Sequence, residues 1–149
     1  MEERGRILAV DPGEKNIGIA ISDPTGSIAR PLMILKHLSK LIDAAEIASL
    51  AKENQTIKIV VGMPTGVDGE QIPQSRHSLN LAEAVRSQSD LLVVLWDESG
   101  STKDARSALI EMDVHVSKRG GHQDALAAMV ILQSYLDAHA GNGDAYDTC

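Results

Sequence analysis

Near its N-terminus the chain reads R-I-L-A-V-D-P-G, from Arg6 to Gly13. A short apolar run that stops at Pro-Gly predicts a buried strand ending in a turn. Asp11 stands at the exit of this strand. Residues 16–22 then alternate isoleucine with small or polar residues, which predicts a half-buried strand. The two segments together predict a β-hairpin with an aspartate beside its turn.

Downstream of the hairpin, the chain alternates strand and helix patterns. Pro31 lies within an apolar segment at 27–35, and a proline there predicts an edge or bulged strand. Ser39 is the expected N-cap of an amphipathic helix that ends near residue 54. The remaining predicted elements are interior parallel strands at 57–61 and 91–96, helices over 73–86, over 102–112 and from 122 or 123 to 137, and a frayed tail from 141 on.

The last helix is distinctive because residues 125–132 are apolar on every face. We therefore expect it to be covered on more than one side. Ala127 and Ala128 follow Asp124 at the i+3 and i+4 positions and form a small-residue face. This face would let the helix approach the sheet closely.

The composition fits one domain in a reducing compartment. The chain has 149 residues, 43% of them hydrophobic, which is enough for a single core. We expect the domain to span 1–138, followed by a flexible tail over 139–149. Cys149 is the only cysteine, which excludes an intrachain disulfide and a cysteine-cluster zinc site. Without a signal peptide or a long apolar run, we expect a soluble, cytoplasmic protein with no membrane partner.

The charge balance limits how the chain could hold nucleic acid. Fourteen Lys and Arg oppose 21 Asp and Glu, which gives a formal charge of −7. That sign is wrong for binding nucleic acid by bulk electrostatics. Aromatic residues make up only 2% of the chain, so base stacking on aromatic side chains cannot be the main interaction that binds a single-stranded nucleic acid. Any binding should therefore be metal-dependent, salt-sensitive and confined to a small basic patch.

Three carboxylates stand at unusual positions. Asp11 and Glu98 each follow an apolar strand, and Asp124 opens the apolar helix. Each has an ordinary alternative, as a turn residue, a loop charge or a first-turn helix charge. In open α/β sheets, however, ligands bind outside the carboxyl ends of the strands. The apolar helix would bring Asp124 close to Asp11 and Glu98.

Clustered carboxylates need cations, and the choice of cation points to a chemistry. Two carboxylates about 4 Å apart repel by roughly 4 kcal/mol at an effective dielectric constant of about 20. Ligation by oxygen alone suits Mg²⁺ or Mn²⁺ rather than zinc. Ions held in this way activate water and stabilise the leaving oxygen in phosphodiester cleavage.

Polar residues near these carboxylates are secondary candidates. The hydroxyl groups of Ser101 and Thr102, at the start of the predicted helix over 102–112, most simply cap that helix. Contact with a phosphate group is the alternative. His122, two residues before Asp124, is either a helix-capping or an exposed residue. The alternative is that it contacts a phosphate group or orients the attacking water. The loop at 62–69 lacks the order of a nucleotide-binding P-loop and predicts a turn. The secondary candidates are Asp97, Ser101, Thr102 and His122.

Four motifs in sequence order carry a family resemblance. They are 7–13 with 20–23, 61–64 with 68–69, 96–98 with 101–102, and 124–133. In this pattern the chain resembles the YqgF/RuvX family, ribonuclease H-like proteins described as Holliday junction resolvases and as nucleases that mature the 5′ end of 16S rRNA precursor. The resemblance covers about Arg6 to Asp137. It implies an α/β, ribonuclease H-like fold, in which a five-stranded mixed sheet is flanked by helices.

The same resemblance implies an activity and its partners. It implies a Mg²⁺- or Mn²⁺-dependent nuclease site at Asp11, Glu98 and Asp124, which leaves a 5′-phosphate and a 3′-hydroxyl. The implied partner is nucleic acid, either an rRNA precursor or a four-way DNA junction, and a homodimer would suit two symmetric cuts. The candidate contacts to the nucleic-acid backbone are Lys15, Lys118 and Arg119, with Arg76 as a weaker one.

The chain departs from the family pattern at basic positions. Asn16 follows Lys15 where the family usually has arginine, Ser99 stands where arginine usually follows the motif glutamate, and the basic stretch at 118–122 is short. Each missing arginine removes a bidentate phosphate partner. A second hypothesis therefore stays open, a nucleic-acid or ribosome-associated binding protein with the same fold and weak or no catalysis. A third, an actin-like ATPase, would need two lobes, for which the chain is short.

Overall fold

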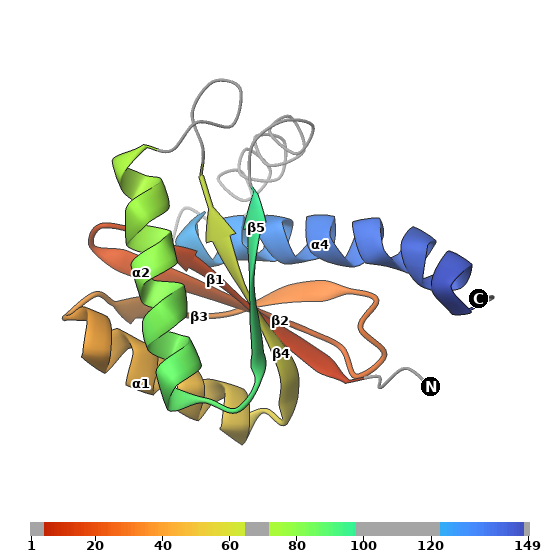
Figure 1. The fold of residues 1–149 in the computed structure, drawn as a ribbon, viewed down its shortest axis with the longest axis horizontal. Helices are drawn as coiled ribbons and strands as arrows, with labels where there is room; N and C mark the ends of the chain where they lie inside the picture. The colour runs from red at the N-terminus through yellow and green to blue at the C-terminus, as the bar shows by residue number, and fades with distance from the viewer. Residues whose placement is uncertain (1–4, 65–71, 98–122, 148–149) are drawn as a thin grey trace.

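The computed structural model describes residues 5–64, 72–97 and 123–147, with the side chains of the last segment described over 125–140. The elements alternate between sheet and helix (Figure 1). Their bounds are β1 (Arg6–Pro12), β2 (Asn16–Ser22), β3 (Ala29–Lys36), α1 (Lys40–Glu53), β4 (Thr56–Met63), α2 (Pro73–Gln88), β5 (Leu92–Asp97) and α4 (Gln123–Asp147).

The strands form one five-stranded sheet in the order β3-β2-β1-β4-β5. β1 pairs antiparallel with β2, and β2 with β3, whereas β1, β4 and β5 run parallel. The mixed sheet and the hairpin are therefore confirmed. β3 lies at the edge, and its register shifts where Pro31 faces Ala20, as expected for a strand residue that cannot donate a ladder hydrogen bond.

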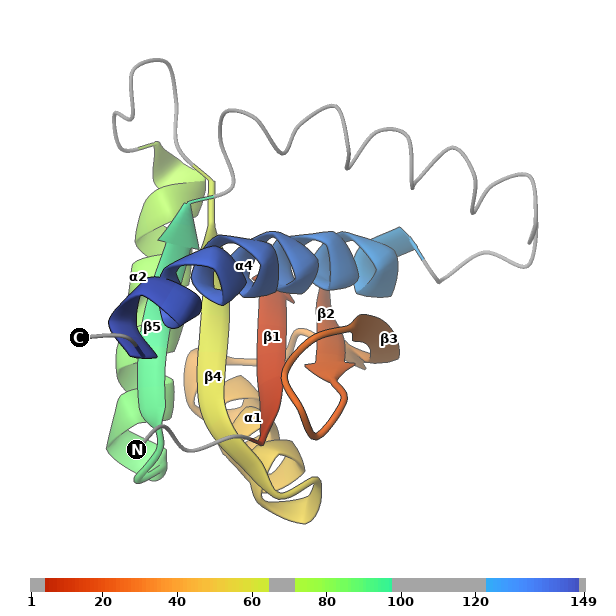
Figure 2. The ribbon, with the colours of Figure 1, turned by 90° about the vertical axis from the view of Figure 1, so that its right-hand side faces the viewer.

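The helices cover the two faces of the sheet (Figure 2). α1 and α2 pack on one face in a core that includes Leu8, Val10 and Ile59, while α4 packs on the other against Ile7 and Ala9. Alternate residues of β1 thus serve opposite layers, as strand geometry requires. Both faces of the central strand are buried.

Two local helix predictions have different outcomes. Ser39 caps α1 as predicted, because its Oγ accepts a hydrogen bond from the Ile42 N–H at 3.2 Å. The predicted end of the last helix at 137 is wrong, since α4 continues to Asp147. His139 supports this extension, because its ring stacks on Tyr135 one turn earlier with centroids 4.0 Å apart. The predicted helix at 102–112 lies outside the described residues.

Asp23 organises the turn between β2 and β3. One carboxylate oxygen accepts hydrogen bonds from the N–H groups of Ser27 at 2.8 Å and Ile28 at 2.9 Å. The other accepts from the hydroxyl and the N–H of Thr25. The Thr25 hydroxyl and these backbone donors hold the pKa of Asp23 well below its ordinary value of 3.8.

Asp23→Ala should therefore destabilise the protein in a pH-dependent way. A carboxyl whose folded pKa lies below its unfolded pKa contributes stability above the unfolded value, and this contribution is lost as the pH falls toward the folded value. The urea midpoint of the variant should thus be below that of the parent at about pH 7, with the gap shrinking at about pH 3. The exposed Asp90 supplies the control Asp90→Ala. A gap that stays constant with pH would contradict this role.

Candidate active site

The strand register brings the ends of three strands to one edge of the sheet. Val10 of β1 is the partner of Val61 in β4, and Gly62 is the partner of Trp96 in β5. Asp11 follows Val10 directly. Because β1, β4 and β5 are parallel, their carboxyl ends lie at the same edge, where ligands bind in α/β sheets (Figure 1).

Asp11 lies on the α4 side of this edge. Ile7 and Ala9 pack against α4, and Asp11 is the next residue of the same alternation. Its cross-strand partner is Gly18, which contributes no side chain next to the carboxylate. Asp11 is only partly exposed. The edge therefore presents a carboxylate whose cross-strand partner has no side chain.

The turn after Asp11 accepts only glycine at residue 13. A Cβ atom on Gly13 would lie 2.3 Å from the backbone carbonyl oxygen of Asn16, far inside van der Waals contact. The Pro-Gly pair that predicted this turn thus has a steric reason for its glycine. The hairpin pairs Asp11 with Gly18, and Lys15 is exposed in the turn that joins the two strands.

Asp97 shares the edge with Asp11 but lies on the other face of the sheet. Val94 and Trp96 of β5 pack on the α4 side, whereas Val93 packs with the core under α1 and α2. Asp97 falls on the same alternation as Val93 and is exposed. The structure therefore does not place Asp97 next to Asp11.

α4 crosses the strands close to this edge (Figure 2). The Trp96 Nε1–H donates to the Ser134 Oγ at 3.1 Å, which anchors the middle of α4 over β5. Asp124 lies in the first turn of α4, about 15 Å along the helix axis from Ser134. β1 lies about 10 Å from β5 across the sheet. The first turn of α4 is therefore offset from β5 in the direction of β1 (Figure 2).

Several predicted site residues lie outside the described residues, and for Asp124 only the backbone is described. Within the described ranges, no group of three His, Cys, Asp or Glu side chains is placed to hold a metal ion. Of the proposed carboxylate ligands, the structure thus describes the side chain of Asp11. The candidates outside the described residues are Glu98, Ser101, Thr102, Lys118, Arg119 and His122.

Two histidines that are distant in the sequence come together at this end of the sheet. The ring centroids of His37 and His77 lie 5.5 Å apart. They follow β3 and lie in α2, respectively. Because His37 and His77 are far apart in the sequence, no local motif predicts their contact, and only the fold brings them together.

Comparison with known proteins identifies the family. A family model described as RuvX, Holliday junction resolvase, matches residues 5–138. The chain belongs to the RuvX family. A relative of this RuvX chain from Clostridioides difficile, named "putative pre-16S rRNA nuclease", is 40% identical over 133 residues, or 89% of this chain and 94% of the relative. One with the same name from Myxococcus xanthus is 36% identical over 134 residues, covering 90% and 89% of the two chains.

Solved structures agree on the fold. Thermus thermophilus RuvC in complex with a Holliday junction substrate matches with a TM-score of 0.62 and 15% identity, covering 92% of this chain and 96% of that one. The fowlpox virus resolvase with Holliday junction DNA matches with a TM-score of 0.57 and 16% identity, covering 90% and 98%. At such identities the likeness shows the fold alone. It confirms the ribonuclease H-like expectation for this RuvX protein.

Proposed function

We propose that this RuvX protein is a divalent-metal-dependent nuclease that hydrolyses phosphodiester bonds. The observation that carries the proposal is Asp11, a carboxylate at the carboxyl end of the central parallel strand, with glycine as its cross-strand partner. Membership of a family described as a Holliday junction resolvase supports the same activity.

The proposed ligands of the cation are Asp11, Glu98 and Asp124. In β5, Trp96 packs on the α4 side and Asp97 falls on the other. Continued strand alternation would assign Glu98 to the α4 side, which is why we favour Glu98 over Asp97. Asp124 comes from the first turn of the helix that covers that face. Three carboxylates match the oxygen ligands that Mg²⁺ and Mn²⁺ prefer.

The protein residues would bind and orient the substrate in this reaction. The bound cation would supply an activated water and would stabilise the leaving oxygen. Asp11 would hold the cation at a fixed place on the sheet edge, since the strand of Asp11 is buried on both faces. Lys15, exposed two residues beyond Pro12-Gly13, would contact the nucleic-acid backbone, as would Lys118 and Arg119.

For the substrate we propose the 5′ end of 16S rRNA precursor first and a four-way DNA junction second. The relatives from Clostridioides difficile and Myxococcus xanthus, at 40% and 36% identity, bear the name of the rRNA activity. Junction complexes occur among the structural matches at 15% and 16% identity, which is too low to carry a substrate over. An rRNA substrate implies action in the cytoplasm, while two symmetric cuts in a junction would require a homodimer. None of the helices in the described ranges is long and apolar enough to span a membrane.

A binding protein with little catalysis is the alternative function. Asn16 and Ser99 stand at positions where the family usually has arginine. An arginine forms two parallel hydrogen bonds with a phosphate, so its loss weakens both binding and charge stabilisation. Substrate binding without cleavage would be the signature of this alternative.

One experiment separates these functions. The purified protein is incubated with Mn²⁺ and with either an end-labelled precursor rRNA fragment or a four-way DNA junction, and both binding and products are measured. We expect 5′-phosphate products from the RNA, and loss of these products when EDTA removes the cation. Cleavage of the junction alone would reverse the substrate order. Binding of either substrate without products would favour the alternative.

A further inference from the structure

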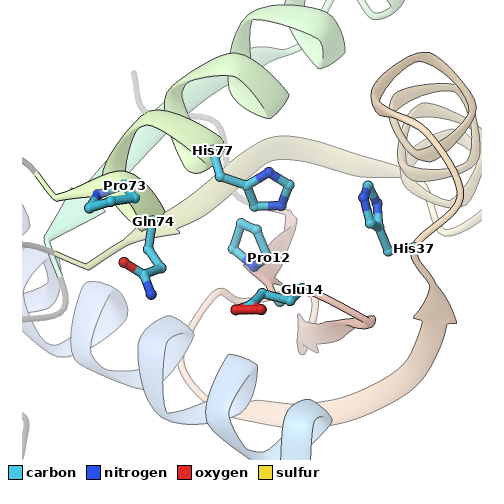
Figure 3. Close-up of a pocket in the computed structure, with 7 residues that line it drawn as sticks. Pro12, Glu14, His37, Pro73, Gln74 and His77 are labelled. Atoms are coloured by element: carbon cyan, nitrogen blue, oxygen red, sulfur yellow. The ribbon is translucent and has the colours of Figure 1, made fainter.

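A cleft of about 490 Å³ opens next to the residue that follows Asp11 (Figure 3). It lies on the α1 and α2 side of the sheet edge, between the β1–β2 turn and the first turn of α2. In Figure 3, His77 extends from α2 above Pro12, and His37 lies opposite. The side chains that line the cleft are Pro12, Glu14, His37, Pro73, Gln74 and His77.

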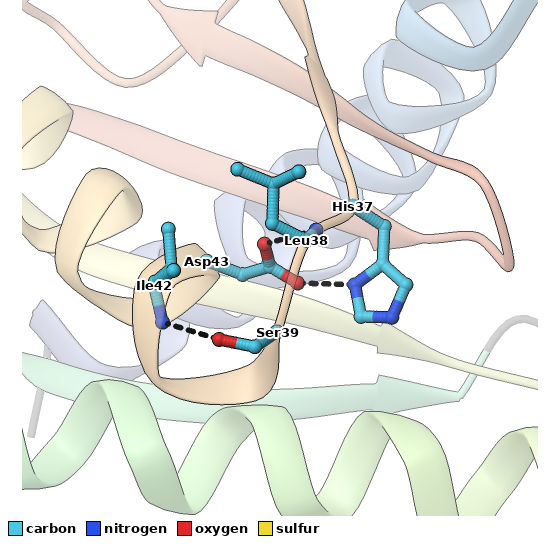
Figure 4. Close-up of polar contacts among 5 residues, drawn as sticks. All are labelled: His37, Leu38, Ser39, Ile42 and Asp43. Carbon is cyan, nitrogen blue, oxygen red and sulfur yellow. Dashed lines mark hydrogen bonds and ion pairs between the residues drawn. The ribbon is translucent and has the colours of Figure 1, made fainter.

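His37 is held in a fixed orientation (Figure 4). Its Nδ1 hydrogen-bonds the Asp43 carboxylate, which is only 2% exposed. The second oxygen of Asp43 accepts the Leu38 N–H at 3.0 Å, and the His37 N–H donates to the Lys15 carbonyl at 2.9 Å. With both backbone and ring anchored, His37 forms a rigid wall.

His77 lies on the α2 side of the cleft, in contact with His37, and carries a polar atom without a hydrogen-bond partner in the described part of the chain. Its ring meets that of His37 edge to face, at an interplanar angle of 80°. Its Nε2 is buried and has no hydrogen-bond partner among the described residues. A buried polar atom without a partner is unfavourable, so such atoms are expected where a ligand supplies the partner.

The chemistry of the walls suits a neutral, planar ligand. Imidazole rings and proline rings offer flat surfaces for stacking, as RNA-binding proteins use for unpaired bases. Glu14 would repel a phosphate in the cleft, but its carboxylate accepts hydrogen bonds from base N–H groups. A metal ion is a poorer match, because no three-ligand group exists among the described residues.

We propose that this cleft binds one unpaired nucleobase of the substrate strand, with guanine preferred. This inference rests on the proposed nuclease function. Guanine presents two adjacent donors, N1–H and the N2 amino group, which match the two oxygens of the Glu14 carboxylate. The other bases lack such a donor pair. Gln74, exposed at the rim, both donates and accepts and so completes the polar edge.

The position of the cleft relates the bound base to the site of cleavage. Glu14 follows Asp11 by three residues, so their Cα atoms lie within about 11 Å. At about 3.4 Å per nucleotide, the base lies within roughly three nucleotides of the scissile phosphate. A second hollow shares Pro73 and His77 and is lined by the exposed Arg76. Arg76 would bind the backbone phosphate of the same nucleotide.

The test measures binding by fluorescence anisotropy with Ca²⁺ in place of Mn²⁺, so that a cation occupies the proposed carboxylates, and a denaturing gel confirms that each strand stays intact. The probes are a short labelled oligouridine and the same strand with one central guanine or adenine. The variants are Glu14→Gln, His77→Ala and His77→Phe, and Glu83→Gln on the exposed face of α2 is the matched control. We expect the guanine strand to bind about tenfold more tightly than the others.

Each variant removes one part of the proposed contact. Glu14→Gln should abolish the preference for guanine, and His77→Ala should weaken binding of every strand about tenfold. His77→Phe should weaken binding less than His77→Ala, since it keeps a stacking ring and loses only the hydrogen bond to Nε2, and Glu83→Gln should behave as the parent. Equal binding of all three strands by the parent, or variants that match the control, would overturn the inference. Failure to cleave any substrate with Mn²⁺ would instead overturn the nuclease function.

Discussion

Asp11→Asn should lower the rate of phosphodiester cleavage about a thousandfold and leave the fold intact. The change keeps the size of the side chain and removes the negative charge that would hold the cation. Leu8, Ala9 and Val10, which precede Asp11 in β1, are fully buried and keep their packing in the variant. The effect should therefore appear in the chemistry rather than in the stability.

Initial rates with Mn²⁺, on the substrate that the parent cleaves, measure this effect. Thermal unfolding of both proteins shows whether the fold is intact, and Asp90→Asn is the control for removal of an exposed carboxylate elsewhere. A rate within about tenfold of the parent would exclude Asp11 from the site. A large fall in the unfolding temperature would show that Asp11 has a structural role.

Ala128→Leu should both destabilise the protein and reduce cleavage. Ala128 is fully buried and lies in the core cluster that joins α4 to Ala9 and Ala20 of the sheet. Adding three carbon atoms there costs about 1–3 kcal/mol through overpacking. Because α4 also carries Asp124 in its first turn, lifting the helix would separate that residue from Asp11.

Unfolding temperature and cleavage rate together test this second effect. For a chain of this length, we expect a fall of about 2–12 °C. Ala138→Leu, on the exposed side of the same helix, is the matched control and should change neither quantity appreciably. A stable, fully active Ala128→Leu protein would show that close packing of α4 is not required.

The parts of the fold that follow from local pattern could be predicted from the sequence. The apolar run before Asp11 and the isoleucine alternation after it specify the hairpin, because side-chain period and turn residues act over a few positions. Ser39 was identifiable as a cap for the same reason. The alanines at 127 and 128 indicated close packing of α4, and both are buried.

Features that depend on tertiary packing could not be predicted. The end of α4 was placed too early because composition alone does not show that His139 stacks on Tyr135. His37 and His77 come from elements that are distant in sequence, so only the packing of α2 over the β1–β2 turn joins them. The separation of Asp97 from Asp11 follows from the register of β5, which the sequence does not specify.

We propose that Asp11 binds a divalent cation at the carboxyl edge of the sheet. Calorimetric titration of Mn²⁺ into the parent protein and into Asp11→Asn, without nucleic acid, measures this binding. We predict a saturable binding isotherm for the parent and an affinity at least about tenfold lower for the variant. Identical isotherms for the two proteins, or no binding by the parent, would contradict the claim.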